Sequence, residues 1–254
     1  MAKSFRFKQF SVANERAAMK VGTDGVLLGA WVSLRGDEQH ILDVGTGTGV
    51  IALMLAQRTD PTRDITRTSA PAILIGIDID AASAEEAAAN FKASPWAGRM
   101  AAFCGDFRGL GADPSHPLKF LAFPYDLIVS NPPFFVDSLK APEARRSTAR
   151  HTDSLAYADL IGGSLGNLAP EGRLALVLPA DVADAFTMKA ESSGLHLSRR
   201  CRVSSVVGRD PVRTLLEFSR EPISFFEDST LAIQNESDFT EEYKSLTRDF
   251  YLKF

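Results

Sequence analysis

The sequence predicts an α/β fold with a mostly parallel central sheet that ends in an antiparallel C-terminal hairpin. Short apolar runs rich in Val and Ile alternate with stretches of good helix formers, which is the pattern of βαβ units. The run 73–77 is continuously apolar, as expected of a strand covered on both faces. The 254 residues, 45% of them hydrophobic, suffice for one such domain with modest additions but not for a second full domain.

The predicted elements follow a basic and aromatic lead-in. We expect residues 1–36 to form this N-terminal lead-in and residues 37–254 to form the main domain. The first predicted strand is 40–44, and the helix formers at 51–56 predict the helix after it. Then follow predicted strand 73–77, helix 81–93, strands 100–104, 125–130 and 173–178, a helix that ends near 193, and a hairpin of 195–203 and 212–218.

Three segments lie between or after these elements. Residues 59–70 are polar and interrupted by proline, which predicts a surface insertion, and residues 113–124 predict a proline-bearing loop. The spacing of apolar side chains in residues 241–254 predicts a helix docked on the domain. These apolar side chains are Tyr243, Leu246, Phe250 and Leu252.

Charge and cysteine content narrow the class of protein. A net charge of −4 argues against a protein that coats nucleic acid through its overall field, so any polyanion must be bound locally. No apolar run approaches the ~18 residues of a membrane helix. Cys104 and Cys201 lie far apart and have no metal-ligand spacing to any histidine. We therefore expect a cytoplasmic protein with no membrane contact and no metal site.

A glycine-rich segment directly follows the first predicted strand. Residues 43–49 alternate glycine with other residues, and Gly45, Gly47 and Gly49 would let the backbone approach a ligand closely. A loop between a strand and a helix is the context of a nucleotide site. Asp43 would repel a pyrophosphate and the lysine of a phosphate-binding loop is missing, which favours a ligand without phosphates here. The alternative is an ordinary turn between a strand and a helix.

A second carboxylate ends the next predicted strand. Asp78 follows the apolar run 73–77, where it could accept both ribose hydroxyls of a nucleoside. Asp80 is expected to cap the helix that follows. NAD is a rival ligand, but the glycine spacing departs from G-x-G-x-x-G. The glycine loop and Asp78 together predict a nucleoside-binding site.

This order of strand, glycine loop and acid resembles the cofactor site of class I S-adenosylmethionine methyltransferases. The resemblance implies a Rossmann-like fold with S-adenosyl-L-methionine as cofactor. It also implies that Asp43 and the glycine loop hold the amino-acid part of the cofactor, Asp78 the ribose and Asp106 the adenine amine. Asp106 follows the predicted strand 100–104, and its alternative role is a solvent-facing turn residue or a helix cap.

Asn131, Pro132, Pro133 and Phe134 follow the predicted strand 125–130, beside the crevice where such a sheet binds ligands. The Asn131 side-chain oxygen and the Pro132 carbonyl could accept both N–H bonds of an amine. Consecutive prolines stiffen the loop, and Phe134 offers a face on which a base can stack. We interpret the four residues as catalytic, with Asn131 also bordering the cofactor. The alternative is a turn that merely ends a strand.

The four residues resemble the N-P-P-F/Y motif of amino-methyltransferases that act on adenine N6, cytosine N4 or a glutamine amide. The resemblance extends to the bacterial tRNA1(Val) adenine-37 N6-methyltransferase family and implies a tRNA anticodon-loop adenine as substrate, without an obligatory protein partner. It is carried by residues 7–10, 18–31, 53–59, 94–96, 149–151 and 250–252. A protein-glutamine N5-methyltransferase, another nucleic-acid adenine N6-methyltransferase and a binding module that has lost catalysis are the alternatives.

Basic residues after the catalytic loop are candidate RNA contacts. Arg145, Arg146, Arg150 and His151 could bind phosphates near the target base. A second group of arginines lies within 199–213. For either group alone, a solvated or ion-paired surface is the favoured interpretation.

The end of the lead-in is a candidate part of the cofactor site. Lys20, Thr23, Asp24 and Gly25 are expected to border the cofactor. The glycines around them predict a flexible lid within residues 1–36, and a structural turn is an equally good interpretation.

Overall fold

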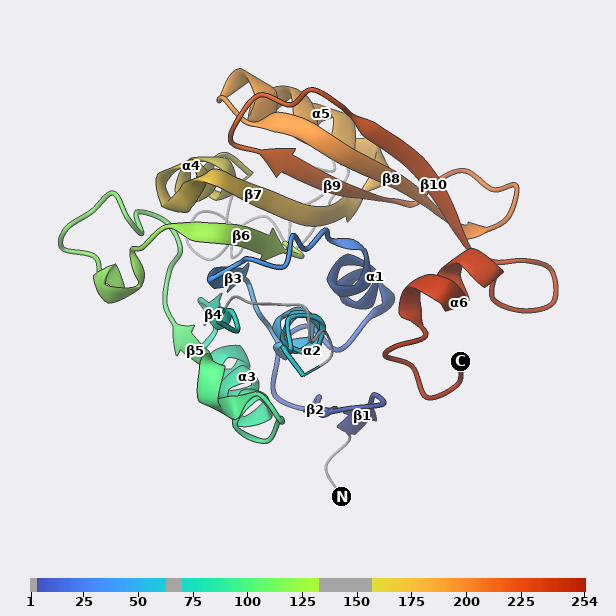
Figure 1. Cartoon of the computed structure of the whole chain (residues 1–254), viewed down its shortest axis with the longest axis horizontal. Helices are drawn as coiled ribbons and strands as arrows, with labels where there is room; N and C mark the ends of the chain where they lie inside the picture. Colours follow the sequence, from blue (N-terminus) through green and yellow to red (C-terminus); the bar gives the residue numbers. More distant parts are fainter. Residues whose placement is uncertain (1–3, 63–69, 133–156) are drawn as a thin grey trace, which may run out of the picture.

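The structure, a computed structural model, describes residues 4–62, 70–132 and 157–254. Within them, eight strands form one sheet in the order β10-β8-β9-β7-β6-β3-β4-β5 (Figure 1). The strands are β3 (His40–Val44), β4 (Ile73–Asp78), β5 (Met100–Cys104), β6 (Tyr125–Ser130), β7 (Leu168–Pro179), β8 (His196–Val206), β9 (Arg213–Ser219) and β10 (Glu227–Gln234). Strands β3 to β7 pair in parallel, and β9 is antiparallel to β7 and β8. The predicted parallel sheet with an antiparallel C-terminal hairpin is confirmed.

Helices cover both faces of this sheet (Figure 1). One apolar cluster joins α1 (Thr23–Trp31), α2 (Val50–Arg58), α3 (Ala81–Lys92) and α6 (Glu241–Thr247) to the small hairpin of β1 (Ser4–Arg6) and β2 (Ser11–Ala13). The other cluster includes α4 (Tyr157–Asn167) and α5 (Ala180–Ser192). Short 3-10 turns cover Ala97–Arg99 and Lys119–Leu121. Along β6, Leu127 and Val129 enter the first cluster and Ile128 the second, because side chains of a strand alternate between faces.

The path of the chain through the sheet reverses at β3. From β3 the chain passes to β4 and β5 on one side, and later to β6 and β7 on the other. A parallel sheet leaves a crevice beyond the carboxyl ends of its strands at such a point. Here the crevice lies beyond Val44 and Ser130, the last residues of β3 and β6, which pair with each other.

Helix α1 is not predicted from the sequence because Gly25 and Gly29 are poor helix formers. The packing against α2 explains both glycines. A Cβ at Gly29 would lie 2.9 Å from the Met54 sulfur, and a Cβ at Gly25 would lie 3.3 Å from a Val50 methyl carbon. The absence of these side chains lets α1 pack closely against α2, and every α1 residue from Gly25 onward is buried.

Other elements of the second half of the chain also differ from the prediction. Helix α4, which contains three glycines, is absent from it, and so is β10, an edge strand that pairs in parallel with β8. Strand β10 is mostly exposed or half-buried and so lacks a clear hydrophobic alternation. Strand β7 begins at Leu168 and not at residue 173. Leu168 already pairs with Tyr125 of β6, and a bulge separates this pairing from the regular pairing that starts at Leu127 and Arg173.

The prediction of one docked helix over residues 241–254 is partly wrong. Helix α6 ends at Thr247, and the side chain of Leu252 is 60% exposed, although Phe250 is buried as expected. The Lys8 ammonium donates a hydrogen bond to the Arg248 carbonyl over 2.6 Å. The last carbonyl groups of a helix lack N–H partners within the helix. When a side chain such as Lys8 donates a hydrogen bond to one of them, the helix can end there.

The first two residues of the predicted surface insertion at 59–70 pack against the domain. Thr59 is fully buried, and its hydroxyl donates to the Leu55 carbonyl over 2.8 Å. The Asp60 carboxylate accepts a hydrogen bond from the Trp96 indole N–H over 2.8 Å. Residues 59 and 60 therefore belong to the packed domain, whereas residues 63–69 lie outside the described part of the chain.

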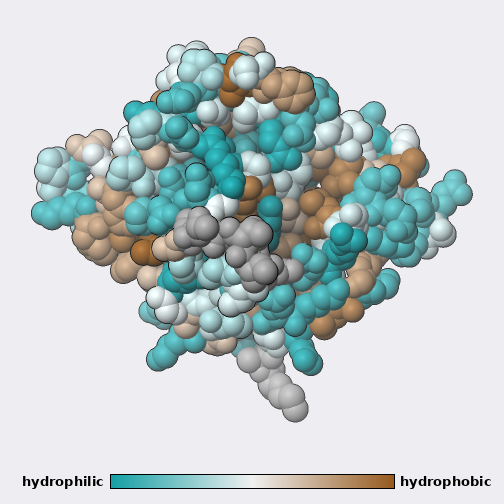
Figure 2. Space-filling view, in the orientation of Figure 1, coloured by the Kyte–Doolittle hydropathy of each residue, from teal (hydrophilic) through white to brown (hydrophobic). Residues whose placement is uncertain are grey.

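Hydrophilic residues cover most of the face shown in Figure 2, and hydrophobic residues lie there in separate patches. Scattered apolar surface of this kind is ordinary for a folded domain. Of the helices that the structure describes, none has both the length and the apolar character needed to cross a membrane.

Candidate functional site

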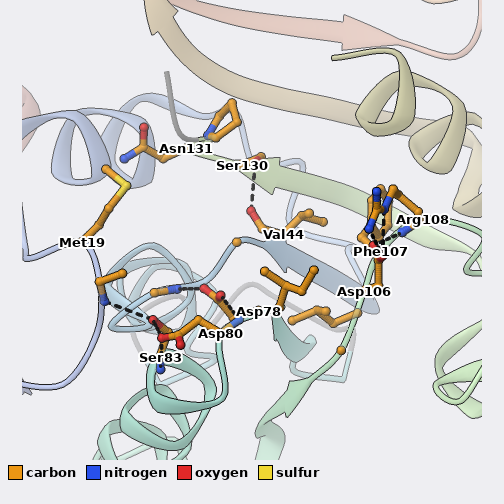
Figure 3. Close-up of a pocket in the computed structure, with 17 residues that line it drawn as sticks. Met19, Val44, Asp78, Asp80, Ser83, Asp106, Phe107, Arg108, Ser130 and Asn131 are labelled. Carbon is orange, nitrogen blue, oxygen red and sulfur yellow. Dashed lines mark hydrogen bonds and ion pairs between the residues drawn. The ribbon is translucent and has the colours of Figure 1, made fainter. Parts of the chain in front are cut away.

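Two adjoining cavities occupy the crevice at the carboxyl edge of the sheet. The first has a volume of about 300 Å³ and the second about 250 Å³, close to the lower end of the roughly 300–1,000 Å³ of small-molecule sites. Met19, Gly45, Gly47 and Asn131 border both cavities. In Figure 3, Met19 and Asn131 lie at one end of the first cavity and Asp106 at the other, with Asp78 between them.

The glycine loop between β3 and α2 needs glycine for both its backbone and its packing. Gly47 has a φ of +57° and Gly49 a φ of +79°, in the left-handed region that favours glycine. The Gly45 N–H donates to the Ile77 carbonyl over 2.8 Å, which ties the loop to the end of β4. A Cβ at Gly49 would collide with the Phe91 ring. Gly45 and Gly47 border the cavities, whereas Gly49 precedes the first turn of α2.

Asp43 lies behind the glycine loop and is fully buried. Its Oδ2 accepts hydrogen bonds from the Thr46 hydroxyl over 2.8 Å and from the Ala52 N–H over 3.3 Å. Its Oδ1 has no partner among the described residues. Burial raises the pKa of Asp43 to about 7, because the charged form is poorly solvated there. Asp43 is not among the described residues that border either cavity, and its contacts hold the loop in shape.

Replacing Asp43 by asparagine should change how stability depends on pH. The folded-state pKa of about 7 lies above the ordinary value of 3.8, so folding favours the protonated form. The free energy of unfolding that Asp43 contributes therefore falls as the pH rises from about 4 to 7. Between pH 5 and pH 7, Asp43→Asn should gain roughly 2 kcal/mol relative to the parent protein. Urea unfolding at both pH values measures this difference, and equal pH dependence in the two proteins would contradict it.

Asp78 ends β4 and borders the first cavity. Its Oδ2 accepts from the Gly47 N–H over 2.8 Å and its Oδ1 from the Asp80 N–H over 2.9 Å. Burial raises the pKa of Asp78 above its ordinary value. Since a carboxylate can accept about four hydrogen bonds, Asp78 keeps acceptor capacity for a ligand. The predicted helix cap is confirmed: the Asp80 side chain accepts from the Ser83 N–H at the start of α3.

Asp106 lies at the far end of the first cavity and also forms a turn. Its Oδ1 accepts from the Arg108 N–H over 2.9 Å, and its Oδ2 accepts from the Arg108 Nε over 2.7 Å. Burial acts to raise the pKa of Asp106, but the hydrogen bonds from Arg108 hold it below its ordinary value. The same carboxylate therefore shapes the turn and borders the cavity, so its two predicted roles are compatible.

Asn131 and Pro132 directly follow β6 and border the first cavity. The Ser130 hydroxyl donates to the Val44 carbonyl over 2.8 Å, which fixes the end of β6 against β3. The Oδ1 atom of Asn131 is buried and has no hydrogen-bond partner in the described part of the chain. A buried acceptor without a partner is costly unless a ligand supplies a donor. Asn131 thus places an acceptor for an N–H or O–H group where the two cavities meet.

Four residues that were expected to border the cofactor border the second cavity. They are Lys20, Thr23, Asp24 and Gly25. Thr23 to Gly25 form the first turn of α1, and Asp24 pairs with Arg213 over 2.8 Å. Thr23, Asp24 and Gly25 are therefore the beginning of a helix held by an ion pair, and residues of the glycine loop border the same cavity.

The remaining candidate residues fall into two groups. Pro133, Phe134, Arg145, Arg146, Arg150 and His151 lie outside the described residues, and their roles stay predictions. Four arginines of the second group face acids at 2.6–3.0 Å: Arg199 pairs with Glu227, Arg200 and Arg202 with Asp228, and Arg213 with Asp24. The favoured interpretation as an ion-paired surface is confirmed for these four arginines.

Several residues that border the first cavity have no role predicted from the sequence. Ala18 and Met19 border it and lie in residues 18–31, whose resemblance to the methyltransferase family is the sequence signal for them. Ser83 lies in α3, and Arg108 follows β5. No local pattern marks either one, because their place at the cavity depends on how distant elements pack together.

Sequence relatives and a family model match this chain. A model described as the methyltransferase small domain matches residues 21–197. A Bacteroides fragilis protein named tRNA1(Val) (adenine(37)-N6)-methyltransferase is 44% identical over 249 residues, which cover 98% of each chain. A protein of the same name from Edwardsiella ictaluri is 40% identical and covers 98% of this chain and 94% of its own length.

Solved structures share the fold at low sequence identity. A protein described as a predicted O-methyltransferase from Agrobacterium tumefaciens has a TM-score of 0.66 at 16% identity, over 89% of this chain and 96% of the other. A 16S rRNA methyltransferase from Thermus thermophilus has a TM-score of 0.54 at 17% identity, over 87% of this chain and 50% of the other. Given the glycine loop, the acceptor at Asn131 and the full-length relatives, the chain belongs to the tRNA1(Val) (adenine(37)-N6)-methyltransferase family of small-domain methyltransferases.

Proposed function

We propose that this chain transfers a methyl group from S-adenosylmethionine to the N6 amine of adenine 37 in a tRNA. The buried Oδ1 of Asn131, which has no hydrogen-bond partner among the described residues, carries the proposal, because it offers an acceptor for an amine N–H where the two cavities meet. The shared name of the full-length relatives supports the choice of adenine 37.

The first cavity fits the chemical groups of S-adenosylmethionine. Asp78 keeps acceptor capacity for ribose hydroxyls, and Asp106 at the far end can accept from an adenine amine. Ile77 and Phe107 also border this cavity and supply apolar surface for a flat base. A Cβ at Gly45 would meet no described atom within 4 Å, so within the described residues the loop backbone there is open to a ligand. When bound, the cofactor supplies an electrophilic methyl group on a sulfonium.

Asn131 and Pro132 orient the amine. The lone pair of an adenine amine is delocalised into the ring, so the amine is a poor nucleophile. The Asn131 Oδ1 accepts one amine N–H and the Pro132 carbonyl accepts the other, which turns the nitrogen toward the methyl group. The hydrogen bond from Ser130 to Val44 keeps this acceptor in place between turnovers. No general base is required before the transfer, which would leave S-adenosylhomocysteine and a protonated methylated amine that loses its extra proton to solvent.

A nucleotide in a tRNA loop suits a cavity of this size. One base must leave its stack to reach Asn131, and a loop nucleotide does so at little cost. Because the net charge is −4, local contacts must hold the tRNA. We assign these contacts to Arg145, Arg146, Arg150 and His151, and we place the reaction in the cytoplasm.

Three methylation reactions with labelled S-adenosylmethionine test the proposal. The purified chain is given an unmodified tRNA1(Val) transcript, the same transcript with guanine at position 37, or a release factor that carries a glutamine acceptor. We expect label only in the first reaction, as N6-methyladenosine after nucleoside digestion. Label in the release factor alone would contradict the tRNA substrate, and equal label in both transcripts would contradict position 37. Turnover by the purified chain also shows that no second protein is required.

A further inference from the structure

The segment that leads into α1 crosses the rim of the first cavity. Residues 14–22, here called the N-terminal strap, connect β2 to α1 and contain no helix or strand. Ala18 and Met19 of the strap border the first cavity, and Met19 borders the second as well. Because the strap has no regular structure of its own, contacts with other elements must set its position.

One buried carboxylate of α3 makes most of these contacts. Glu86 is 3% exposed, and its two oxygens accept hydrogen bonds from three successive backbone N–H groups of the strap. The donors are Glu15 at 2.8 Å, Arg16 at 2.9 Å and Ala17 at 2.8 Å. A charged acceptor that receives hydrogen bonds from three successive backbone N–H groups is a strong and directional anchor.

Asn90 lies one turn further along α3 and joins the end of β2, directly before the strap, to the glycine loop. Its Oδ1 accepts from the Ala13 N–H over 2.7 Å, and its Nδ2 donates to the Thr48 carbonyl over 2.9 Å. Ser83, Glu86 and Asn90 lie three and four residues apart, which places them on one side of the helix. This side of α3 therefore holds the backbone from Ala13 to Ala18, which includes the N-terminal part of the strap.

The residues that follow Ala17 in the strap form part of the wall of the first cavity. The Ser83 hydroxyl accepts from the Ala18 N–H over 3.2 Å, and both residues border the first cavity (Figure 3). A Cβ at Gly47 would lie 3.9 Å from the Met19 carbonyl oxygen, so the strap passes close to the glycine loop. In Figure 3, the Met19 side chain lies at the same end of the cavity as Asn131.

We propose that Glu86 is a positioning residue for cofactor binding, which holds the strap so that Ala18 and Met19 complete the wall of the first cavity. This inference rests on the proposed function, in which that cavity takes S-adenosylmethionine. Glu86 does not border either cavity among the described residues, so it acts through the strap backbone and not through ligand contact. Its loss should therefore weaken cofactor binding and leave the orientation of the amine at Asn131 intact.

Glu86→Gln tests this role, and Glu85→Gln is the matched control. The amide keeps the size of the side chain but offers one acceptor oxygen to three donors, whereas Glu85 pairs with Arg16 at the surface. Titration calorimetry should show the Kd for S-adenosylmethionine rising by at least about tenfold in Glu86→Gln, with kcat at saturating cofactor within about threefold of the parent. In Glu85→Gln the Kd should stay within about twofold.

Hydrogen exchange gives a second readout. Bound S-adenosylhomocysteine should slow exchange in the strap peptide of the parent protein and of Glu85→Gln, but much less in Glu86→Gln. An unchanged Kd and unchanged protection in Glu86→Gln would overturn the positioning role. If the parent protein itself fails to bind cofactor, the proposed function is overturned instead.

A surface variant keeps the inference testable if Glu86→Gln does not fold. Met19 is 44% exposed, so Met19→Ala removes part of the proposed wall without opening the core. The Kd for S-adenosylmethionine should rise by about threefold to tenfold, since apolar contact with the ligand is lost. An unchanged Kd would show that the strap does not contribute to binding.

Discussion

Asn131→Ala is expected to lower kcat by about 10³-fold, because it removes the acceptor that orients the amine during methyl transfer. The Kd for S-adenosylmethionine should change by less than about threefold, since Asp78 and the glycine loop bind the cofactor. Steady-state methylation of the tRNA transcript at saturating substrates measures the first quantity, and titration calorimetry measures the second. The pairing of a large kcat loss with nearly intact affinity distinguishes this role from a general disturbance of the site.

Asn235→Ala is the matched control for the loss of an asparagine. The Asn235 side chain accepts a hydrogen bond from the Ser237 N–H over 3.0 Å in an exposed turn and borders neither cavity. Its kcat should equal that of the parent protein. Normal turnover in Asn131→Ala would remove Asn131 from the mechanism, and with it the observation that carries the proposed function.

Asp78→Ala is expected to raise the Kd for S-adenosylmethionine on the order of 100-fold. The variant loses the acceptor proposed for the ribose hydroxyls, and it also leaves the Gly47 N–H without its partner in the folded loop. Charge-assisted hydrogen bonds contribute roughly 1.5–3 kcal/mol each, so the loss of one or two accounts for a change of this size. Titration calorimetry measures the affinity, and kcat at saturating cofactor should fall far less.

Asp113→Ala is the corresponding control, since Asp113 also accepts a backbone N–H, that of Ser115 at 2.8 Å, but in an exposed loop. Its cofactor affinity should match that of the parent protein. If Asp78→Ala bound S-adenosylmethionine as tightly as the parent, the ribose assignment would have to be abandoned.

The sequence predicts the central part of the fold well, because the pattern there is local. Strands such as β3 and β6 are short apolar runs bounded by turn residues, and Asp80 caps α3 as its position suggests. Helix α1 is not predicted because its glycines lower the helix propensity of the segment. Gly29 is needed there because a larger residue would collide with Met54 of α2. Strand β10 is not predicted because an exposed edge strand has little hydrophobic alternation in its sequence.

Some parts of the candidate site can likewise be predicted from the sequence, and others cannot. The glycine loop, Asp78 and Asn131 each directly follow or end a strand, so their order in the chain predicts their place at the edge of the sheet. The contacts of Glu86 with the strap join residues about 70 positions apart through backbone N–H groups, for which no residue type is required. A single sequence contains no local pattern that would reveal such an anchor.

Strand β9 lies between β7 and β8 in the sheet, although it follows both of them in the chain. The ribosome therefore delivers residues 168–206 before residues 213–219, and one side of β7 has no partner until β9 emerges. An unpaired strand edge is a place where chains associate wrongly. The nascent protein should thus be most prone to aggregation, and most dependent on chaperones, in the interval between translation of β7 and translation of β9.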